Sequence, residues 1–391
     1  MKVNILFQTT GLSQYDLITV FTEAMADALI KMGHCAVVIG GKQTLYRSIL
    51  DILNEKEWDA FVSFNGVGCD EVYDGLLSVK KRIEFYIDHP VWHKSRIFVD
   101  KQQHNIACVD RNHVELIRDL CIKTEKQGLY FFPHGGMQGT ETKGWQDRQY
   151  DISLFGSCLS REEALEQLKQ LDPDMQNAAA WLIDYLTAHP QASLEEATGE
   201  LLNLLGGSQD MIISLLEQFI WVDQIIRGYF REKIVNTVAT SGYKIHIFGN
   251  GWENSSCIKN ENVILHESVS YMEHLNIMGD TKIVLNVMPW FKDGFHERIP
   301  CAMLNGAVCL TDSSTYIEEQ FTDGKDIVLY SLEHLGELPG KIQNILENPE
   351  QSVQIAKNGY ENADKNHRWS NRAKLLVDMI NDRADNVLRD R

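Results

Sequence analysis

The residues best suited to chemistry lie in one stretch of the chain, residues 282–312. The apolar run at its start, which includes Asn286, is too short for a helix and predicts a buried strand. A polar loop follows, and it carries three side chains that could handle a proton or an anion: His296, Glu297 and Arg298. In open parallel sheets, ligands bind where such a loop leaves the carboxyl end of a strand.

A short helix and a second strand complete this unit. The helix starts near Arg298, and Asn305-Gly306 is typical of its end, because glycine adopts the left-handed conformation of a C-terminal cap. The apolar run 307–311 predicts the next strand. The amino end of the helix favours an anion, so we expect a phosphate-bearing ligand beside the loop. Four residues of this stretch are predicted to line the ligand site: Asn286, His296, Asn305 and Gly306.

Length and composition predict a globular protein of two domains. The chain has 391 residues, too many for one ordinary domain, and 44% of them are hydrophobic. It contains no run of about 18 uncharged apolar residues, so we expect no membrane span. The apolar run 3–7 leads straight into a loop, and we predict no signal peptide there.

Charge and cysteine usage narrow the choice of partners. The formal net charge of −18 argues against nucleic acid, which needs a basic face, and against an anionic membrane surface. A local basic pocket is still compatible with that charge. The eight cysteines are scattered without a Cys-x-x-Cys pair, which is typical of reduced thiols in a cytoplasmic protein.

Short apolar runs alternate with helical patterns in the first third of the chain. Strands are predicted at 3–7, 35–39, 60–64, 82–88, 105–109 and 130–132, and helices at 17–32, 44–54 and 112–120. This alternation is typical of a parallel, doubly wound sheet. The loop after the first strand has one glycine, Gly11, and lacks the three spaced glycines of a dinucleotide fingerprint.

A strand at 151–157 opens the second domain, and a helical insertion follows it. The insertion spans about 160–240, with helical patterns at 178–188, 194–205 and 211–235. Two interpretations are open: a cover for one face of the sheet, which we prefer, or an arm for acceptor recognition or homodimer formation.

The alternation of strands and helices then resumes. Strands are predicted at 243–248, 263–265, 283–287, 307–311 and 326–330, and helices at 271–279, 333–347, 349–363 and 370–388. We therefore predict an α/β fold of two Rossmann-like domains, 1–150 and 151–369, facing a cleft. The first is the acceptor side, and the last helix, within 370–391, packs back onto it.

A family resemblance lies in the same stretch as the candidate site. The sequence RIPCAMLNGA at 298–307, followed by Leu310-Thr311, resembles the R-x-F-E-A-M-A-C-G-A…L-T pattern of CgeB-like (spore maturation protein type) glycosyltransferases. These are relatives of the group 1 glycosyltransferases with the GT-B fold. The resemblance implies metal-independent sugar transfer from a nucleotide-sugar donor, with retention at the anomeric carbon and a UDP-sugar as the expected donor.

The resemblance also implies roles for single residues. The glutamate that binds the donor ribose in the family falls on Cys301, and the first acidic position falls on Asp293. A thiol cannot accept two hydroxyl bonds as a carboxylate does, and Glu297 would replace it from within the loop. Arg298 and Arg161 would hold the diphosphate, Arg161 because a similar arginine recurs in the family.

Two glycines, Gly249 and Gly251, follow a predicted strand end. Without side chains, they would let the backbone approach a nucleotide closely. An ordinary turn explains them equally well. Trp252 beside them is either a core residue or part of a base pocket.

Asp88 and His89 end the fourth predicted strand. The family has a similar Asp-x-Pro there, so these side chains could orient the acceptor or take its proton. His89 and His93 are four residues apart, but Pro90 disrupts helical geometry, and we predict no metal site. We interpret His134, after the sixth strand, as a loop cap.

The predicted function is that of a bacterial, cytoplasmic glycosyltransferase of the hexosyltransferase type. It would bind a nucleotide sugar and pass the sugar to a protein, a glycan or a lipid, without another cofactor. Cys301 leaves two alternatives open: a degenerate protein that binds a sugar nucleotide or a partner without catalysis, and a GT-B sugar-nucleotide epimerase.

Overall fold

A computed structural model describes residues 2–9, 16–40, 44, 48–67, 79–97, 104–120, 128–158 and 161–387. Gly11 and the predicted helical residues 45–47 lie outside these ranges, as does the side chain of Arg161. The chain folds into two compact units, Met1–Gly135 with Asn366–Arg391, and Gly136–Lys365. The division therefore falls after Gly135, where the sequence analysis places it at 150.

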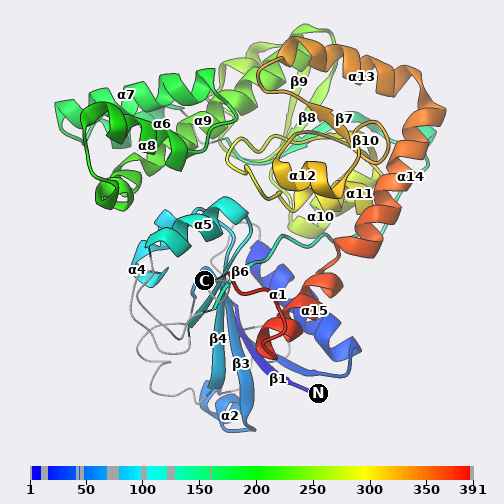
Figure 1. Ribbon diagram of the computed structural model, residues 1–391. Helices are drawn as coiled ribbons and strands as arrows, with labels where there is room; N and C mark the ends of the chain where they lie inside the picture. The colour runs from blue at the N-terminus through cyan, green and yellow to red at the C-terminus, as the bar shows by residue number, and fades with distance from the viewer. Residues whose placement is uncertain are drawn as a thin grey trace. The chain divides into compact units, whose positions relative to one another are not determined.

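The first unit is built on a parallel sheet of six strands in the order β2-β1-β3-β4-β5-β6. Strands β1, β3 and β4 lie side by side in Figure 1. The strands are β1 (Asn4–Gln8), β2 (Cys35–Ile39), β3 (Trp58–Phe64), β4 (Val79–Tyr86), β5 (His104–Cys108) and β6 (Gly128–Phe131). Ile5, Leu6 and Phe7 of β1 are fully buried, which is why this strand reads as a continuous apolar run. Leu6 pairs with Val37 on one side and Phe61 on the other.

Helices connect these strands. They are α1 (Leu17–Lys31), α2 (Ile49–Leu53), η2 (Pro90–His93), α4 (Lys94–Ile97), α5 (Arg111–Leu120) and the returning α15 (Trp369–Ile380). The predicted helix 44–54 is helical only in its last part, and Thr44 instead lies in a turn, its Oγ1 donating to Val38 O at 2.6 Å.

The end of the chain belongs to the first unit. Helix α15 packs against α1, with the Trp369 and Phe21 rings 4.7 Å apart. The predicted helix 370–388 ends early, at Ile380, because Asp382 adopts a left-handed φ of 57°. Beyond this turn the chain meets the outer strand β6: Val387 N–H donates to Leu129 O, and Leu129 N–H donates to Asn386 Oδ1, both at 3.0 Å.

The second unit has a second six-stranded parallel sheet, in the order β12-β11-β10-β7-β8-β9. Its strands are β7 (Tyr150–Phe155), β8 (Ile245–Phe248), β9 (Val263–His266), β10 (Thr281–Leu285), β11 (Val308–Asp312) and β12 (Val328–Tyr330). The helices after the insertion are η5 (Ser256–Lys259), α10 (Tyr271–Gly279), α11 (Arg298–Leu304), α12 (Thr315–Gln320), η6 (Leu335–Glu337), α13 (Leu338–Glu347) and α14 (Pro349–Asn366); η3 (Trp145–Asp147) precedes β7.

The helical insertion consists of α6 (Arg161–Leu168), α7 (Pro173–Ala188), α8 (Leu194–Leu205), η4 (Gln209–Met211) and the long α9 (Ile212–Thr240). Helices α6, α7 and α8 pack on α9, as their green group in Figure 1 shows, while α9 also packs against β8 and α13. Helix α9, through its packing on β8, fits the preferred interpretation of a cover for the sheet. Phe219, Phe230, Ile234 and Val238 of α9 are fully buried and explain its length.

Two further observations concern the cysteines and the hydropathy of the helices. The six cysteines in the described part of the chain, Cys35, Cys108, Cys158, Cys257, Cys301 and Cys309, are free thiols. Among the described helices, none has the length and apolar character needed to cross a bilayer.

Candidate anion-binding site

The candidate site lies in the second unit, where the central strands β7 and β10 run side by side. Ile152 of β7 pairs with Ile283 of β10, so the carboxyl ends of both strands reach the same edge of the sheet. Phe155 ends β7, and the loop that leaves β10 leads to α11, which begins at Arg298. Helix α11 has only seven residues, so its dipole is small and side chains must hold any anion.

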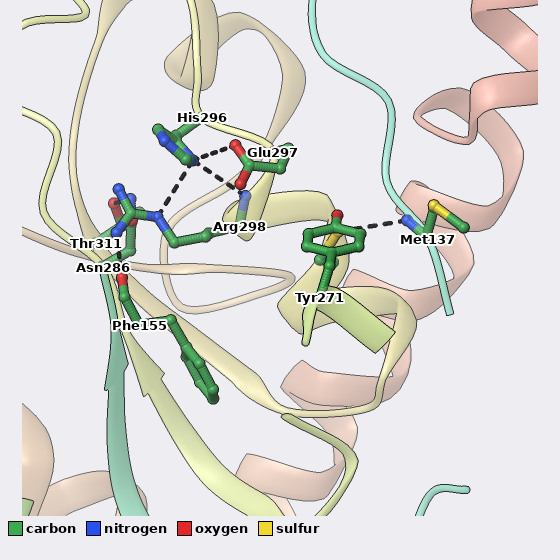
Figure 2. A network of polar contacts seen from close by, with 9 residues as sticks. Met137, Phe155, Tyr271, Asn286, His296, Glu297, Arg298 and Thr311 are labelled. Atoms are coloured by element: carbon green, nitrogen blue, oxygen red, sulfur yellow. Dashed lines mark hydrogen bonds and ion pairs between the residues drawn. The ribbon is translucent and has the colours of Figure 1, made fainter. Parts of the chain in front are cut away.

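Arg298 is buried with its side chain directed at the end of β7 (Figure 2). It is 7% exposed. Its Nη1 donates to Phe155 O, and its Nε donates to His296 Nδ1 at 3.1 Å. Its Nη2 is buried and has no hydrogen-bond partner among the described residues. A guanidinium held on two sides with its third nitrogen unpaired is poised to bind an anion.

Gly156 makes this position of Arg298 accessible. Its φ is +142°, and a Cβ at this residue would lie 2.6 Å from Arg298 Nη1. Only glycine therefore allows the guanidinium to reach the Phe155 carbonyl.

His296 and Glu297 surround the base of the Arg298 side chain. Glu297 is 5% exposed, and its carboxylate contacts His296 Nδ1. Burial lowers the pKa of Arg298, and the neighbouring Glu297 partly reverses that decrease. Burial also lowers the pKa of His274, on α10, to about 4, so this ring is neutral at physiological pH. His274 therefore adds no positive charge beside Arg298.

Two further arginines, which the sequence analysis missed, extend from α9. Arg231 donates through Nη1 to Ser157 O, the residue after Gly156. Arg227 forms an ion pair with Asp223, 2.6 Å between Nη2 and Oδ2. The Nε atoms of both arginines are buried and unpaired within the described part of the chain.

The ring of Trp290, in the loop after β10, supports both guanidinium groups. The Cζ atoms of Arg227 and Arg231 lie 4.2 and 5.2 Å from its centroid, within the range of cation–π interaction. Burial lowers the pKa of Arg231, and the positive charges of Arg298 and Arg227 lower it further. Arg231 Nη2 and Arg298 Nη1 lie 3.7 and 2.6 Å from the same point, the position of a Cβ at Gly156, and Arg227 shares the Trp290 ring with Arg231. Arg227, Arg231 and Arg298 are therefore called the arginine cluster below.

A signal for these arginines exists in the sequence. Arg227 and Arg231 are four residues apart and so lie on one face of a helix. They alternate with the buried Ile226 and Phe230, so the pair sits beside the apolar face and not on the solvent side. That placement distinguishes it from a solvated charge pair.

Asn286 follows Leu285 of β10, which pairs with Leu154 of β7, so it lies level with Phe155, whose carbonyl accepts from Arg298. It is 1% exposed, and its Nδ2 donates to Thr311 Oγ1 at 2.9 Å. Its Oδ1 is buried without a hydrogen-bond partner among the described residues. The structure therefore brings together four predicted residues: Asn286, His296, Glu297 and Arg298.

Two other predicted residues of this stretch, Asn305 and Gly306, make structural contacts. Asn305 is fully buried; its Nδ2 donates to Met137 O at 3.1 Å, and its Oδ1 accepts from Gly139 N–H at 2.7 Å. Gly306 has a φ of 69° and ends α11. These contacts give both residues a structural role, and their predicted contact with the donor stays a prediction.

Cys301 occupies the position of the family's ribose-binding glutamate. It is 1% exposed, and its Sγ accepts from Met137 N–H and contacts Tyr271 Oη, both at 3.3 Å. Burial raises the pKa of its thiol to about 12, so the sulfur remains protonated. The thiol is engaged inside the protein.

The glycines after β8 serve packing. A Cβ at Gly249 would overlap Gly156 O, and one at Gly251 would overlap Cys158 O. Trp252 is fully buried, and its indole N–H donates to Gly156 O at 2.9 Å. Of the two interpretations of Trp252, the structure therefore supports the core residue, because no surface of it is open to a nucleotide.

Asp88 and His89 belong to the first unit. Asp88 Oδ2 accepts from Asn65 Nδ2 at 3.0 Å and lies 3.7 Å from His93 Nε2. His89 is 6% exposed and accepts at Nδ1 from Val91 N–H at 3.3 Å. Their predicted catalytic roles stay predictions, and so does the role of Arg161, the first residue of α6.

Part of the chain matches a known protein family. Residues 230–378 match the family described as glycosyl transferase-like, and this segment includes Arg231 and Arg298. Among curated protein sequences, none matches the chain.

Solved structures share the fold over nearly the whole chain. A glycosyltransferase from Rickettsia africae ESF-5 is 9% identical with a TM-score of 0.56, covering 97% of this chain and 98% of that one. HepE from Anabaena, in complex with UDP-glucose, is 10% identical with a TM-score of 0.54, covering 97% and 100%. Sucrose-phosphate synthase from Thermosynechococcus elongatus is 11% identical with a TM-score of 0.50, covering 97% and 99%. The predicted α/β fold of the GT-B type is confirmed.

Proposed function

We propose that this chain is a glycosyltransferase that moves a sugar from a nucleoside diphosphate donor to an acceptor. The observation that carries the proposal is the arginine cluster at the carboxyl ends of β7 and β10, where one buried nitrogen of each guanidinium has no hydrogen-bond partner among the described residues. A buried N–H donor without a hydrogen-bond partner costs free energy, and a bound diphosphate would recover that cost.

The same cluster would assist the chemical step. When the bond between the anomeric carbon and the diphosphate breaks, negative charge develops on the departing phosphate oxygen. Guanidinium groups already fixed by Phe155 O, Ser157 O and the Trp290 ring would stabilise that charge without reorganising. These side chains supply the positive charge, which supports a metal-independent reaction.

A UDP-sugar is the donor to test first. HepE, which shares the fold, was crystallised with UDP-glucose, and the matched family is glycosyl transferase-like. Retention at the anomeric carbon and the CgeB-like specificity follow from the resemblance at 298–307. In the first unit, Asp88 or His89 would orient the acceptor, which is a protein, a glycan or a lipid.

One observation favours a second candidate, a protein that binds a sugar nucleotide without transferring the sugar. The Cys301 thiol is buried and bonded to Tyr271 and Met137, so it offers no carboxylate to a ribose. Tight UDP binding without release of nucleotide from any UDP-sugar would support this candidate.

The test combines binding with catalysis. Calorimetric titration with UDP is compared for the wild type, Arg298→Ala, and Arg118→Ala as a control at a surface arginine paired with Glu115. Loss of a charge-assisted contact worth about 1.5–3 kcal/mol should weaken UDP binding by about 10- to 150-fold in Arg298→Ala only. Nucleotide release from UDP-, GDP- and dTDP-sugars is then measured, with product analysis to detect epimerisation.

Equal UDP affinity in the wild type and Arg298→Ala would show that the arginine cluster does not bind the donor. Absence of both binding and nucleotide release with every donor would contradict the proposed function.

A further inference from the structure

A pocket of about 280 Å³ lies in the second unit beside the candidate site. It opens at the carboxyl ends of β11 and β12, and its lining includes Asp312, Tyr330 and Ser331 from these strands and their loops, with Phe291, Lys292 and Lys341 around them. None of the residues of the arginine cluster lines it.

A short chain of hydrogen bonds lies between this pocket and the arginine cluster. The Tyr330 hydroxyl donates to Asn286 O at 2.6 Å, and Asn286 Nδ2 donates to Thr311 Oγ1 at 2.9 Å. Asn286 follows strand β10, whose loop leads to Arg298, whereas Tyr330 lines the pocket. The two sites are therefore neighbours along the same edge of one sheet.

A buried carboxylate lines the pocket. Asp312 is 3% exposed, and the hydrogen bonds from Met288 N–H at 2.9 Å and Thr311 Oγ1 at 3.3 Å both go to Oδ1. No hydrogen bond from another described residue reaches its Oδ2, which is left to accept hydrogen bonds from a ligand. A carboxylate with one oxygen anchored and the other available is suited to hydroxyl donors.

The charges around the pocket disfavour an anion. Three carboxylates, Asp312, Glu318 and Glu337, face two lysines in its lining. Lys292 already donates to Pro190 O at 2.5 Å. A nucleoside phosphate would therefore be repelled here, whereas a neutral molecule with hydroxyl groups could use both the acceptors and the donors.

The size of the pocket limits the ligand to one ring. Pockets for drug-sized ligands span about 300–1,000 Å³, and this one lies just below that range at about 280 Å³. Phe291 and Tyr330 supply apolar wall beside the polar groups. Apolar faces with hydroxyl groups at the ring edge are the chemistry of a sugar.

We propose that this pocket binds one neutral sugar ring of the acceptor, with Asp312 Oδ2 accepting hydrogen bonds from its hydroxyl groups. The assignment of the ring to the acceptor rests on the proposed function. Pro190 and Gln191, between α7 and α8, also line the pocket. The helical insertion thereby contributes to acceptor recognition, which is the second of the two interpretations left open by the sequence.

The test is saturation-transfer NMR with glucose, galactose, mannose, N-acetylglucosamine and glucosamine, each at millimolar concentration. At least one neutral sugar should give a signal with the wild type. That signal should weaken about tenfold or more in Asp312→Asn and disappear in Ser331→Trp, which fills the pocket. Glu350→Gln, at an exposed carboxylate of α14, should leave it unchanged.

Circular dichroism and UDP titration check that Ser331→Trp is folded. If this variant does not fold, Lys341→Trp, which fills the pocket from α13, replaces it. No signal from any neutral sugar, or a signal that both pocket variants leave unchanged, would overturn the inference. Binding of glucosamine alone would also overturn it, since the pocket would then select an amine. Because UDP titration reports only on the arginine cluster, failure of the proposed function is distinguishable from failure of this inference.

Discussion

Arg298 is buried although no carboxylate of the described residues pairs directly with its guanidinium. Its donors go to a backbone carbonyl and a histidine nitrogen, and Nη2 has no partner within the described part of the chain. A purely structural arginine would be expected to satisfy all its donors, because each unsatisfied buried one costs about 1–3 kcal/mol. The same incomplete pairing recurs at Arg227 and Arg231, and this repetition is what distinguishes a binding site from a packing defect.

Asp312 permits a prediction about the pH dependence of stability. Burial raises its pKa to about 6, although the Met288 N–H and Lys292 act in the opposite direction. The pKa of Asp312 is higher in the folded protein than its ordinary value of about 3.9, so protonation of this carboxylate stabilises the fold. This stabilisation is complete below about pH 3.9 and is lost as pH rises through about 6. Arg298, Tyr330 and Cys309 are the other titratable groups near this carboxylate.

Asp312→Asn carries no charge at any pH and keeps an oxygen for the Met288 N–H. Its free energy of unfolding, relative to the wild type, should therefore increase by up to about 3 kcal/mol between about pH 4 and pH 7.5. Urea denaturation at several pH values measures this, with Glu350→Gln as a surface control. A difference that is independent of pH would show that Asp312 titrates normally.

At the scale of elements, the junction between β7 and the loop after β10 depends on Gly156. Alanine there would combine a strained φ of +142° with a Cβ 2.6 Å from Arg298 Nη1. We expect Gly156→Ala to displace the guanidinium and weaken UDP binding about tenfold or more, while circular dichroism stays unchanged. Gly324→Ala, at a surface turn with a φ of +71° and open space around it, is the matched control for backbone strain. Equal effects of both substitutions would contradict this role.

Several elements could be predicted because their boundary signals are local. Helix α8 has the predicted limits, since Ser193 and Glu196 form a capping box and Gly206 adopts φ 67° after its end. Helix α10 is fixed in the same way by Ser270 and Glu273. The end of α15 could not be predicted, because Asp382 is compatible with a helix until its φ of 57° is known.

The site was only partly predictable, for a physical reason. His296, Glu297 and Arg298 are adjacent in sequence to the strand that positions them. Arg227 and Arg231 reach the site through the packing of α9, more than fifty residues away, and sequence spacing does not encode that packing. Gly249 and Gly251 illustrate the converse: a close backbone neighbour and a close ligand require the same residue, so the pattern cannot separate them.

At the scale of the molecule, the second unit is one continuous segment, Gly136–Lys365, whereas the first needs both ends of the chain. We therefore expect residues 136–365 to fold alone and to bind UDP, because the arginine cluster lies entirely within them. Residues 1–135 alone should be unstable, since Trp369 would no longer cover Phe21 and Phe64. Circular dichroism, thermal melting and UDP titration of both fragments measure this. A fragment 136–365 that is unfolded, or folded without affinity for UDP, would contradict it.

The turn after α15 has a consequence for self-association. Strand β6 is the outermost strand of its sheet, and an unprotected outer strand is a template on which other chains can add. Asn386 and Val387 occupy both backbone groups of Leu129 in that strand. We expect them to protect this edge against the addition of another strand. A protein cut just before Asn386 should therefore fold yet aggregate on storage, which light scattering measures.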